Sequence, residues 1–144
     1  YVDMLTGLYN RNKDISIVKA AKDQILKNVG VAYIDLNGLK AINDNYGHSN
    51  GDKFICTAAD TFKMVFPDNS YRIGGDEFVI IEQNIERDKY EERITALKNI
   101  MQDKQVSISI GVLWREYVDD LEELLKAADK LMYMEKEMYH NNRE

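Results

Sequence analysis

Cysteine, proline and long apolar runs are scarce in this sequence of 144 residues. It has one cysteine, Cys56, and one proline, Pro67. A single cysteine excludes an intramolecular disulfide and gives no sign of an oxidising compartment, which favours a cytoplasmic location. No stretch approaches the ~18 apolar residues that span a bilayer, and the first residues lack a signal-peptide pattern. We therefore expect a segment without membrane contact, although its parent protein could carry an anchor elsewhere.

Internal repeats, low-complexity tracts and flexible linkers are absent as well. This absence, together with a length typical of one domain, predicts a single domain over residues 1–144. The 44% hydrophobic content indicates a packed core. Because the chain has no initiator methionine, we expect it to be a domain excised from a longer multidomain signalling protein.

Positive charge is also in short supply, since 19 Lys and Arg stand against 25 Asp and Glu and give a net charge of −6. This balance argues against nucleic acid as a partner, because phosphate backbones are held by clustered basic side chains. It is compatible with a nucleotide substrate, since a divalent metal can recruit phosphate to an acidic site. Net charge alone therefore does not separate an enzyme from a binding module.

The sequence does contain a regular alternation of helical and strand patterns. Apolar residues at helical spacing predict helices over residues 10–28, 51–66, 86–103 and 120–140, with the acidic stretch 116–123 as the solvated entrance of the last helix. Short apolar or alternating runs predict strands over residues 31–36, 71–73, 77–81 and 106–112. The middle two strands form a hairpin, and we expect its Gly74-Gly75 turn to use positive φ. The resulting βαββαβ order predicts an α+β, ferredoxin-like core with a mixed central sheet flanked by helices.

Two carboxylates are expected to meet in this fold. Asp35 ends the first strand and Asp76 lies in the central turn, and neighbouring strands are only ~5 Å apart. Mg²⁺ takes one or two carboxylates, with phosphate and water oxygens completing its octahedron, and paired metals promote in-line phosphoryl transfer. Asp35, Asp76 and the adjacent Glu77 therefore suit nucleotidyl transfer. Spacing alone favours equally the alternative that they are ordinary solvated residues at a strand end and a turn.

The residues around this site resemble those of a known family. Gly74-Gly75-Asp76-Glu77-Phe78 is similar to the GGDEF signature of diguanylate cyclases, and further family-like segments follow the same order at residues 3–11, 39–48, 51–52, 107–111 and 128–133. The resemblance covers essentially the whole chain. It implies a cyclase-type fold that condenses two GTP into cyclic di-GMP plus two pyrophosphates, by two-metal nucleotidyl transfer across a homodimer of domains.

The resemblance implies catalytic and metal-binding roles for four residues. Asp35, Asp76 and Glu77 would be the catalytic residues. Together with the Leu36 carbonyl they would hold two Mg²⁺ ions, for which Mn²⁺ could substitute, and Glu77 would also help to activate the attacking 3′-hydroxyl.

Guanine recognition is implied at Asn43 and Asp52. These residues match the family's base-reading pair, in which an amide serves the O6 or N3 side and a carboxylate accepts from the N1 and N2 hydrogens. Without the resemblance, the preferred interpretation of both is that of helix or cap residues.

Triphosphate binding is implied for the loop after the first strand and for one lysine of the last helix. The free backbone N–H groups of Gly38, Leu39 and Lys40 would cradle phosphate, and Lys136 would add a point charge. Lys136 by itself has a simpler interpretation, as a solvated residue paired with Glu135 or Glu137.

Four positions depart from the family pattern. Asn37 and Gly38 replace the usual second aspartate and aromatic, which removes a charge near the metals but leaves the backbone donors in place. His140 stands where the phosphate-binding arginine is expected, and only Arg143, one turn further on, could compensate. Val65 replaces the arginine of the product-inhibition site, so we expect no inhibitory site although Asp68 remains.

The implied partners are GTP, a second copy of the domain, and an N-terminal sensor or regulatory domain outside the chain. His140 keeps open the alternative of a catalytically weak or inactive GTP-binding or interaction module of the same fold. An enzyme acting on another nucleotide also fits the metal site, although Asn43 and Asp52 favour GTP.

Overall fold

The computed structural model describes residues 1–142, and its elements alternate in the order expected from residue 31 onward. The four strands are β1 (Leu26–Leu36), β2 (Ser70–Arg72), β3 (Glu77–Glu82) and β4 (Ile108–Val118). The five helices within the described range are α1 (Arg11–Ala20), α2 (Leu39–Tyr46), α3 (His48–Val65), α4 (Arg87–Asp103) and α5 (Leu121–Asn142).

The four strands form one sheet in the order β2-β3-β1-β4, and every pairing between them is antiparallel. The expectation of a mixed sheet is therefore wrong, while the α+β, ferredoxin-like order is confirmed. β1 and β2, which the helical crossover joins, do run in the same direction, but β3 lies between them. The one parallel pairing in the described chain is an isolated bridge between Tyr9, which belongs to no named strand, and Tyr71 of β2.

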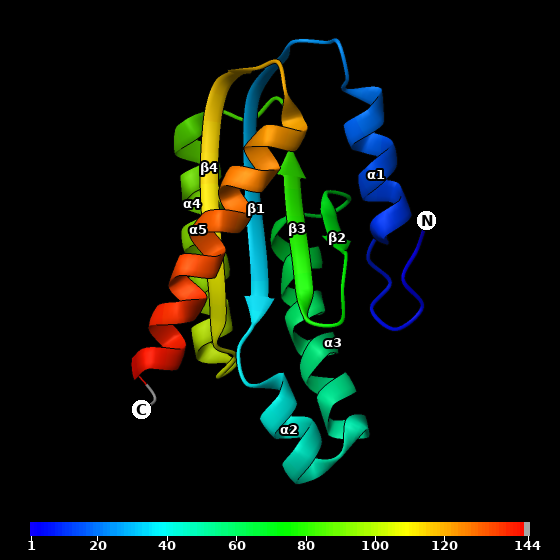
Figure 1. Ribbon diagram of the computed structural model, residues 1–144, viewed down its shortest axis with the longest axis vertical. Helices are drawn as coiled ribbons and strands as arrows, with labels where there is room; N and C mark the ends of the chain where they lie inside the picture. The colour runs from blue at the N-terminus through cyan, green and yellow to red at the C-terminus, as the bar shows by residue number, and fades with distance from the viewer. Residues whose placement is uncertain (143–144) are drawn as a thin grey trace.

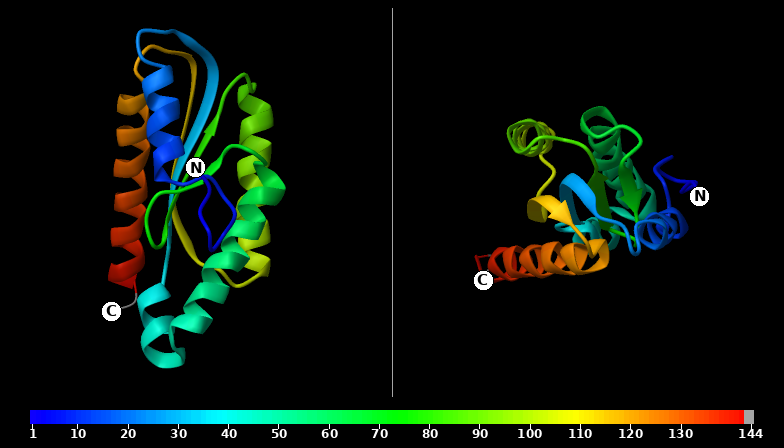
Figure 2. Two further views of the ribbon diagram at one scale, coloured as in Figure 1. Left: turned by 90° about the vertical axis from the view of Figure 1, so that its right-hand side faces the viewer. Right: turned by 90° about the horizontal axis from the view of Figure 1, so that it is seen from above.

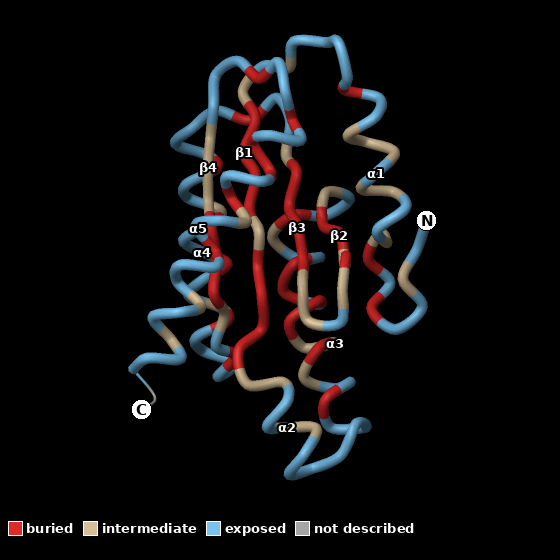
Figure 3. The backbone as a smooth tube through the Cα atoms, in the orientation of Figure 1, coloured by how far each residue is buried: buried red, intermediate tan, exposed pale blue. Residues whose placement is uncertain are grey.

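Helices cover both faces of the sheet, which makes three layers (Figures 1 and 2). One face packs on α3 and α4 through residues such as Ile34, Phe62 and Leu97. The other face packs on α5 and partly on α1 through residues such as Val31 and Leu125. Because both faces of β1 are covered, its sequence is a nearly continuous apolar run rather than an alternating one. Figure 3 shows the burial concentrated in β1 and β3 and the exposed end of the molecule around α2.

The first helix is shorter than its sequence pattern predicts. α1 ends at Ala20, and Leu26, expected inside the helix, begins β1 five residues before the predicted strand start at Val31. Asp23 takes a left-handed φ of 63° in the connection, where an α-helix cannot continue. Leu26 instead pairs with Val118 across the sheet. Strand pairing, a non-local interaction, therefore overrides the local helical spacing.

The second half of the chain also differs from prediction at its boundaries. β4 runs on to Val118, so Glu116, assigned to a helix entrance, lies in a strand. α5 then begins at Leu121, with the Glu123 N–H donating to Asp120 Oδ1 at 3.0 Å as an N-cap. α5 can lie close to β4 because Gly111 has no side chain. A Cβ at this position would sit 1.9 Å from the Ala128 carbonyl oxygen and would clash with it.

No helix within residues 1–142 combines the length and the apolar character needed to cross a membrane. Residues 39–46, for which the sequence pattern predicts no helix or strand, form the short helix α2 after the end of β1. α2 packs against α3 and lies beyond the sheet in Figure 1. The loop that enters α2 is therefore held at the same end of the sheet as the β2–β3 turn.

Candidate active site

Asp35 and the β2–β3 turn meet at one end of the sheet, as the sequence predicts. Asp35 lies directly opposite Glu77 in the antiparallel pairing of β1 with β3. The next residue, Leu36, donates its backbone N–H to the Asp76 carbonyl at 2.9 Å. Backbone pairing thus brings Asp35 of β1 next to Asp76 and Glu77, which are more than 40 positions away in the sequence.

Asp35 is buried, and the structure gives only one of its oxygens a partner. Its side chain is 1% exposed, and Lys136 Nζ donates to Oδ2 at 2.7 Å. Oδ1 is buried without a hydrogen-bond partner among the described residues. Burial raises the pKa of Asp35 to about 6, the Lys136 hydrogen bond opposes this rise, and the neighbouring Asp76 charge adds to it. The site therefore holds a costly, incompletely satisfied carboxylate.

Lys136 is part of this carboxylate site. Its hydrogen bond to Asp35 raises the pKa of the ammonium group, and Asp76 and Glu77 act in the same direction. The simpler interpretation, in which Lys136 pairs with Glu135 or Glu137 on its own helix, is wrong because its described ion pair is with Asp35. Glu135 instead accepts from the Ile110 N–H at 3.3 Å on β4.

A pocket of about 390 Å³ opens beside these residues. Its lining combines the β1–α2 loop, the signature turn and the end of α5, and comprises Leu36, Asn37, Gly38, Leu39, Lys40, Ala41, Asp44, Asp76, Lys136, Tyr139 and His140. Gly38 precedes α2 in a left-handed conformation with φ of 83°, and no side chain caps the helix start. The first N–H groups of α2 are therefore available to an anion, which is the arrangement expected for the triphosphate loop.

Comparison with known proteins assigns the chain to a family. The family model described as "Diguanylate cyclase, GGDEF domain" matches residues 1–142. The chain belongs to the GGDEF domain family. It is 36% identical to the signaling protein YkoW of Bacillus subtilis (strain 168), over 95% of the chain and 19% of YkoW. It is 34% identical to the diguanylate cyclase DgcS of Shewanella oneidensis, over 93% of the chain and 49% of DgcS.

Solved structures agree with this assignment. The GGDEF domain of PA1120 (TpbB or YfiN) from Pseudomonas aeruginosa matches with a TM-score of 0.78 at 26% identity, covering 96% of this chain and 90% of that one. The present chain spans half or less of the two curated relatives named above. It is therefore comparable with one domain of those longer proteins.

Asn37 anchors the loop of this GGDEF domain, a role that the sequence did not reveal. Its Nδ2 donates to Ser107 Oγ at 3.0 Å, and its Oδ1 accepts from Ser109 Oγ at 2.9 Å. The Asn37 backbone N–H also donates to the Ser107 carbonyl at 2.9 Å. An amide offers both a donor and an acceptor to this buried network, whereas an ionised carboxylate offers only acceptors. Asn37, which stands where the family has a second aspartate, is therefore complementary to Ser107 and Ser109.

The two residues of the expected guanine pair lie close together but outside the pocket lining. Asn43 on α2 is half-buried, and its Oδ1 lies 1.7 Å from where a Cβ would stand on Gly51 of α3. A side chain at Gly51 would displace Asn43. Asp52, the next residue, is exposed. The GGDEF domain thus brings the amide next to the helix turn that carries the carboxylate.

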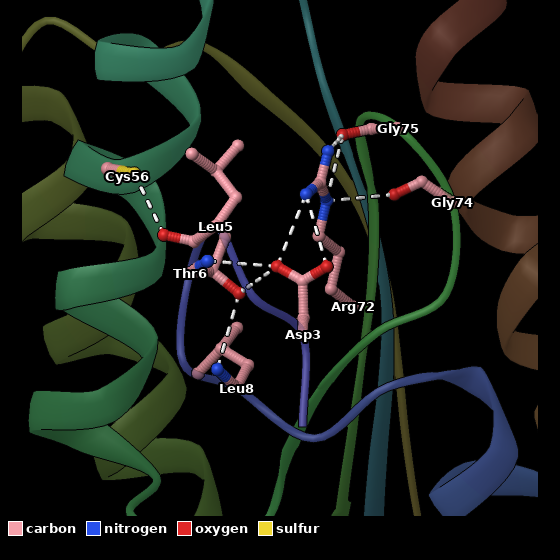
Figure 4. A network of polar contacts seen from close by, with 8 residues as sticks. All are labelled: Asp3, Leu5, Thr6, Leu8, Cys56, Arg72, Gly74 and Gly75. Carbon is pink, nitrogen blue, oxygen red and sulfur yellow. Dashed lines mark hydrogen bonds and ion pairs between the residues drawn. The ribbon is translucent and has the colours of Figure 1, made fainter. Parts of the chain in front are cut away.

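The signature turn is held from outside by Arg72, as Figure 4 shows. Its guanidinium donates to the carbonyls of Gly74 and Gly75 at 2.9–3.2 Å and to the carboxylate of Asp3 at 3.2–3.3 Å. Asp3 also accepts from the N–H and the hydroxyl of Thr6. Neither glycine of the turn adopts a left-handed φ, so the expected positive-φ turn is wrong. Arg72 stabilises the turn in place of a tight two-residue geometry.

Three further expectations concern residues at the edges of the site. His140 lines the pocket at an exposed position of α5. Arg143, proposed to compensate for it, lies outside the described residues. Val65 packs against the core from the end of α3, while Asp68 is exposed after the helix. The position of the inhibitory arginine is thus occupied by an apolar, inward-packing side chain.

The carboxylates of this site suit a divalent metal whose other ligands come from outside the protein. Within residues 1–142 no group of three or more His, Cys, Asp or Glu side chains is arranged to hold a metal. Mg²⁺ needs only one or two carboxylates when phosphate and water supply its other ligands. Asp35 and Asp76 meet that requirement, and the buried Asp35 Oδ1 has a free acceptor position. The residues therefore fit a metal that arrives with a nucleotide better than a metal caged by protein alone.

Proposed function

We propose that this domain is a diguanylate cyclase that condenses two GTP molecules into cyclic di-GMP with release of two pyrophosphates. The observation that carries the proposal is the meeting of buried Asp35 with Asp76 beside a pocket whose lining includes an uncapped helix start. Family membership and the 34% identity to DgcS, which is named a diguanylate cyclase, give further support.

In this proposal the residues of the chain divide the work of one half-reaction. The backbone N–H groups of Gly38, Leu39 and Lys40 bind the triphosphate, and Lys136 supplies a nearby positive charge. Asn43 and Asp52 read the guanine edge, the amide and the carboxylate offering complementary donors and acceptors. Most of the acceleration comes from positioning and from charge compensation at the phosphate.

Asp35, the Leu36 carbonyl, Asp76 and Glu77 would hold the divalent metals. Bound Mg²⁺, or Mn²⁺ in its place, would neutralise phosphate charge and favour ionisation of the attacking 3′-hydroxyl. Glu77 extends from the strand directly opposite Asp35, so its carboxylate can accept a proton or support the ligand set from that side.

One domain presents only half of the reaction. We propose that each copy binds one GTP and that two copies face each other across a two-fold axis. A sensor or regulatory domain elsewhere in the parent protein would control that encounter in the cytoplasm. Nucleic acid is not a partner in this scheme.

An inactive or weak GTP-binding module is the second candidate, because His140 stands in the pocket lining where the family places arginine. A neutral imidazole cannot replace a bidentate guanidinium. This candidate keeps nucleotide binding and lacks turnover, so product formation separates the two.

The test is cyclic di-GMP production, detected by mass spectrometry, from the domain fused to a constitutive dimeriser and supplied with GTP and Mg²⁺. We expect product from the fusion and much less from the unfused domain at the same low concentration. The Asp76→Asn fusion is the matched control and should lose activity at least about a hundredfold, since it loses a ligand on which charge compensation depends. A folded dimer that binds GTP but forms no product would favour the module instead.

A further inference from the structure

Lys136 occupies an unexpected position for a residue assigned to the triphosphate. It is committed to Asp35 at 2.7 Å, and Asp35 is the residue assigned to the metal. The two groups therefore neutralise each other. A residue can leave such a pair without a large cost only if both partners gain new ones, because a buried unpaired carboxylate is strongly unfavourable.

The geometry supplies both replacement partners at the same place. Asp35 Oδ1 is buried and without a hydrogen-bond partner among the described residues, so it is the acceptor left for a cation while Lys136 holds Oδ2. Lys136 is 35% exposed and lines the pocket together with Gly38 and Lys40, so its ammonium can turn toward an anion bound there. Neither replacement alone satisfies both members of the pair.

We propose that Lys136 couples the two binding events: the Lys136–Asp35 ion pair opposes binding of metal alone and of triphosphate alone, and favours binding of both together. This inference rests on the proposed function, since it concerns the same nucleotide site. A metal at Asp35 is repelled by the ammonium group unless phosphate draws that group away. A triphosphate alone must take Lys136 from Asp35 and leave the carboxylate buried and unpaired. Each ligand thus removes the obstacle to the other, which is positive and reciprocal coupling.

The coupling makes two predictions about binding affinity, one for a metal without nucleotide and one for a nucleotide without metal. Lys136→Met should bind Mn²⁺ in the absence of nucleotide at least about tenfold more tightly than the natural chain, because the competing cation is gone. Asp35→Asn should bind GTP in EDTA at least about tenfold more tightly, because Lys136 is released from its partner. Mn²⁺ binding is measured by electron paramagnetic resonance and GTP binding by calorimetry.

Matched variants separate this coupling from simple changes of net charge. Lys40→Met removes a positive charge from the same pocket without touching the described Asp35 ion pair, and should change Mn²⁺ affinity much less than Lys136→Met. Asp76→Asn removes a negative charge but keeps the ion pair, and should raise metal-free GTP affinity much less than Asp35→Asn. In a Lys136→Met background, the gain in GTP affinity from Asp35→Asn should disappear.

Thermal melts establish that each variant is folded, and Lys136→Gln replaces Lys136→Met should the latter aggregate. An unchanged Mn²⁺ affinity in the folded Lys136 variant, or a GTP gain that persists in the double variant, would overturn the inference. The proposed function can fail separately. If the domain shows the coupling but forms no cyclic di-GMP, the inference stands and the proposed enzyme activity is refuted. If the domain is active but shows neither affinity shift, the proposed function stands and the coupling is refuted.

Discussion

At the scale of single residues, the site is dominated by the cost of placing Asp35 in the interior. A carboxylate with a side chain exposed by 1% is stabilised by one lysine and by little else in the described chain. Asn37, two residues on, is also buried, but both of its side-chain polar atoms have a partner, Ser107 for Nδ2 and Ser109 for Oδ1. The two residues show opposite solutions for buried polar groups. Asn37 has partners for both polar atoms, whereas Asp35 keeps an unsatisfied oxygen, as ligand-binding groups often do.

This cost predicts how Asp35→Asn changes stability with pH. Burial raises the pKa of Asp35 from its ordinary value of 3.8 to about 6, so the folded state binds a proton more tightly than the unfolded state. The penalty on folding is fully present above pH 6 and is lost as pH falls from about 6 to the ordinary value of 3.8. Asp35→Asn should therefore raise the free energy of unfolding by on the order of 2 kcal/mol at pH 7.5.

The check is a series of urea titrations of both proteins between pH 4 and pH 8. The difference between them should shrink as pH falls and vanish near pH 4. A difference that stays constant over this range, or a variant less stable than the natural chain at pH 7.5, would contradict the assigned burial cost.

At the scale of elements, short segments are held in place by contacts that reach across the fold. The signature turn is not fixed by its own glycines, since neither takes a left-handed φ. It is closed by the Ile73 N–H, which donates to the Glu77 carbonyl at 3.0 Å, and held by Arg72, which links it to Asp3 and through Asp3 to Thr6 (Figure 4). The segment before α1 is therefore linked through Arg72 to the turn that carries Asp76, and the position of this segment can influence the geometry of the site.

Replacing the fork of Arg72 should loosen this turn without unfolding the domain. Arg72→Lys keeps a positive charge near Asp3 but loses the several parallel bonds to Gly74 and Gly75, a loss of about 1–2 kcal/mol. The Leu36 amide, which donates to the Asp76 carbonyl, should then exchange with deuterium about tenfold faster.

The internal reference is the Tyr90 amide on α4, which donates to the Glu86 carbonyl far from the turn and should exchange unchanged. Faster exchange at both positions would indicate global destabilisation instead. Equal protection of Leu36 in both proteins would show that the turn is held by other contacts.

At the scale of the whole molecule, the surface where the family resemblance places product feedback, at the end of α3, lies outside the pocket lining. Val65 stands where the family has the arginine of its inhibitory site, and it packs against the core. Asp68, the other residue of that site, is exposed and has no arginine at position 65 beside it. The strongest phosphate-gripping group of such a site is therefore missing.

We expect cyclic di-GMP to inhibit the dimeriser fusion only by competing with GTP. Initial rates measured with added product should recover fully, within about 20%, when GTP is raised to saturation, because competition at one site is overcome by mass action. Inhibition that persists at saturating GTP would reveal a separate product site and refute the expected absence of feedback.

The sequence by itself determined most of the elements and the adjacency of Asp35 to the turn that carries Asp76. Hydrophobic periodicity predicted α3, α4, α5 and the β2–β3 hairpin, since long amphipathic patterns survive folding. It misplaced the end of α1 and the start of β1, because Leu26 has helical spacing but finds a strand partner in Val118. The meeting of Asp35 with Asp76 followed from strand adjacency, and the GGDEF signature marked the same residues.

Only the tertiary structure decided how those residues are satisfied. Lys136 lies 101 positions from Asp35, Ser109 lies 72 from Asn37, and Arg72 lies 69 from Asp3. Pairs so distant leave no periodic trace in a sequence, because each side chain alone is consistent with a solvated role. Their partners are fixed by the antiparallel packing of β1 between β3 and β4 and by α5 lying across that sheet. The sequence thus marks the candidate site residues, and the packing of the fold determines which charges they meet.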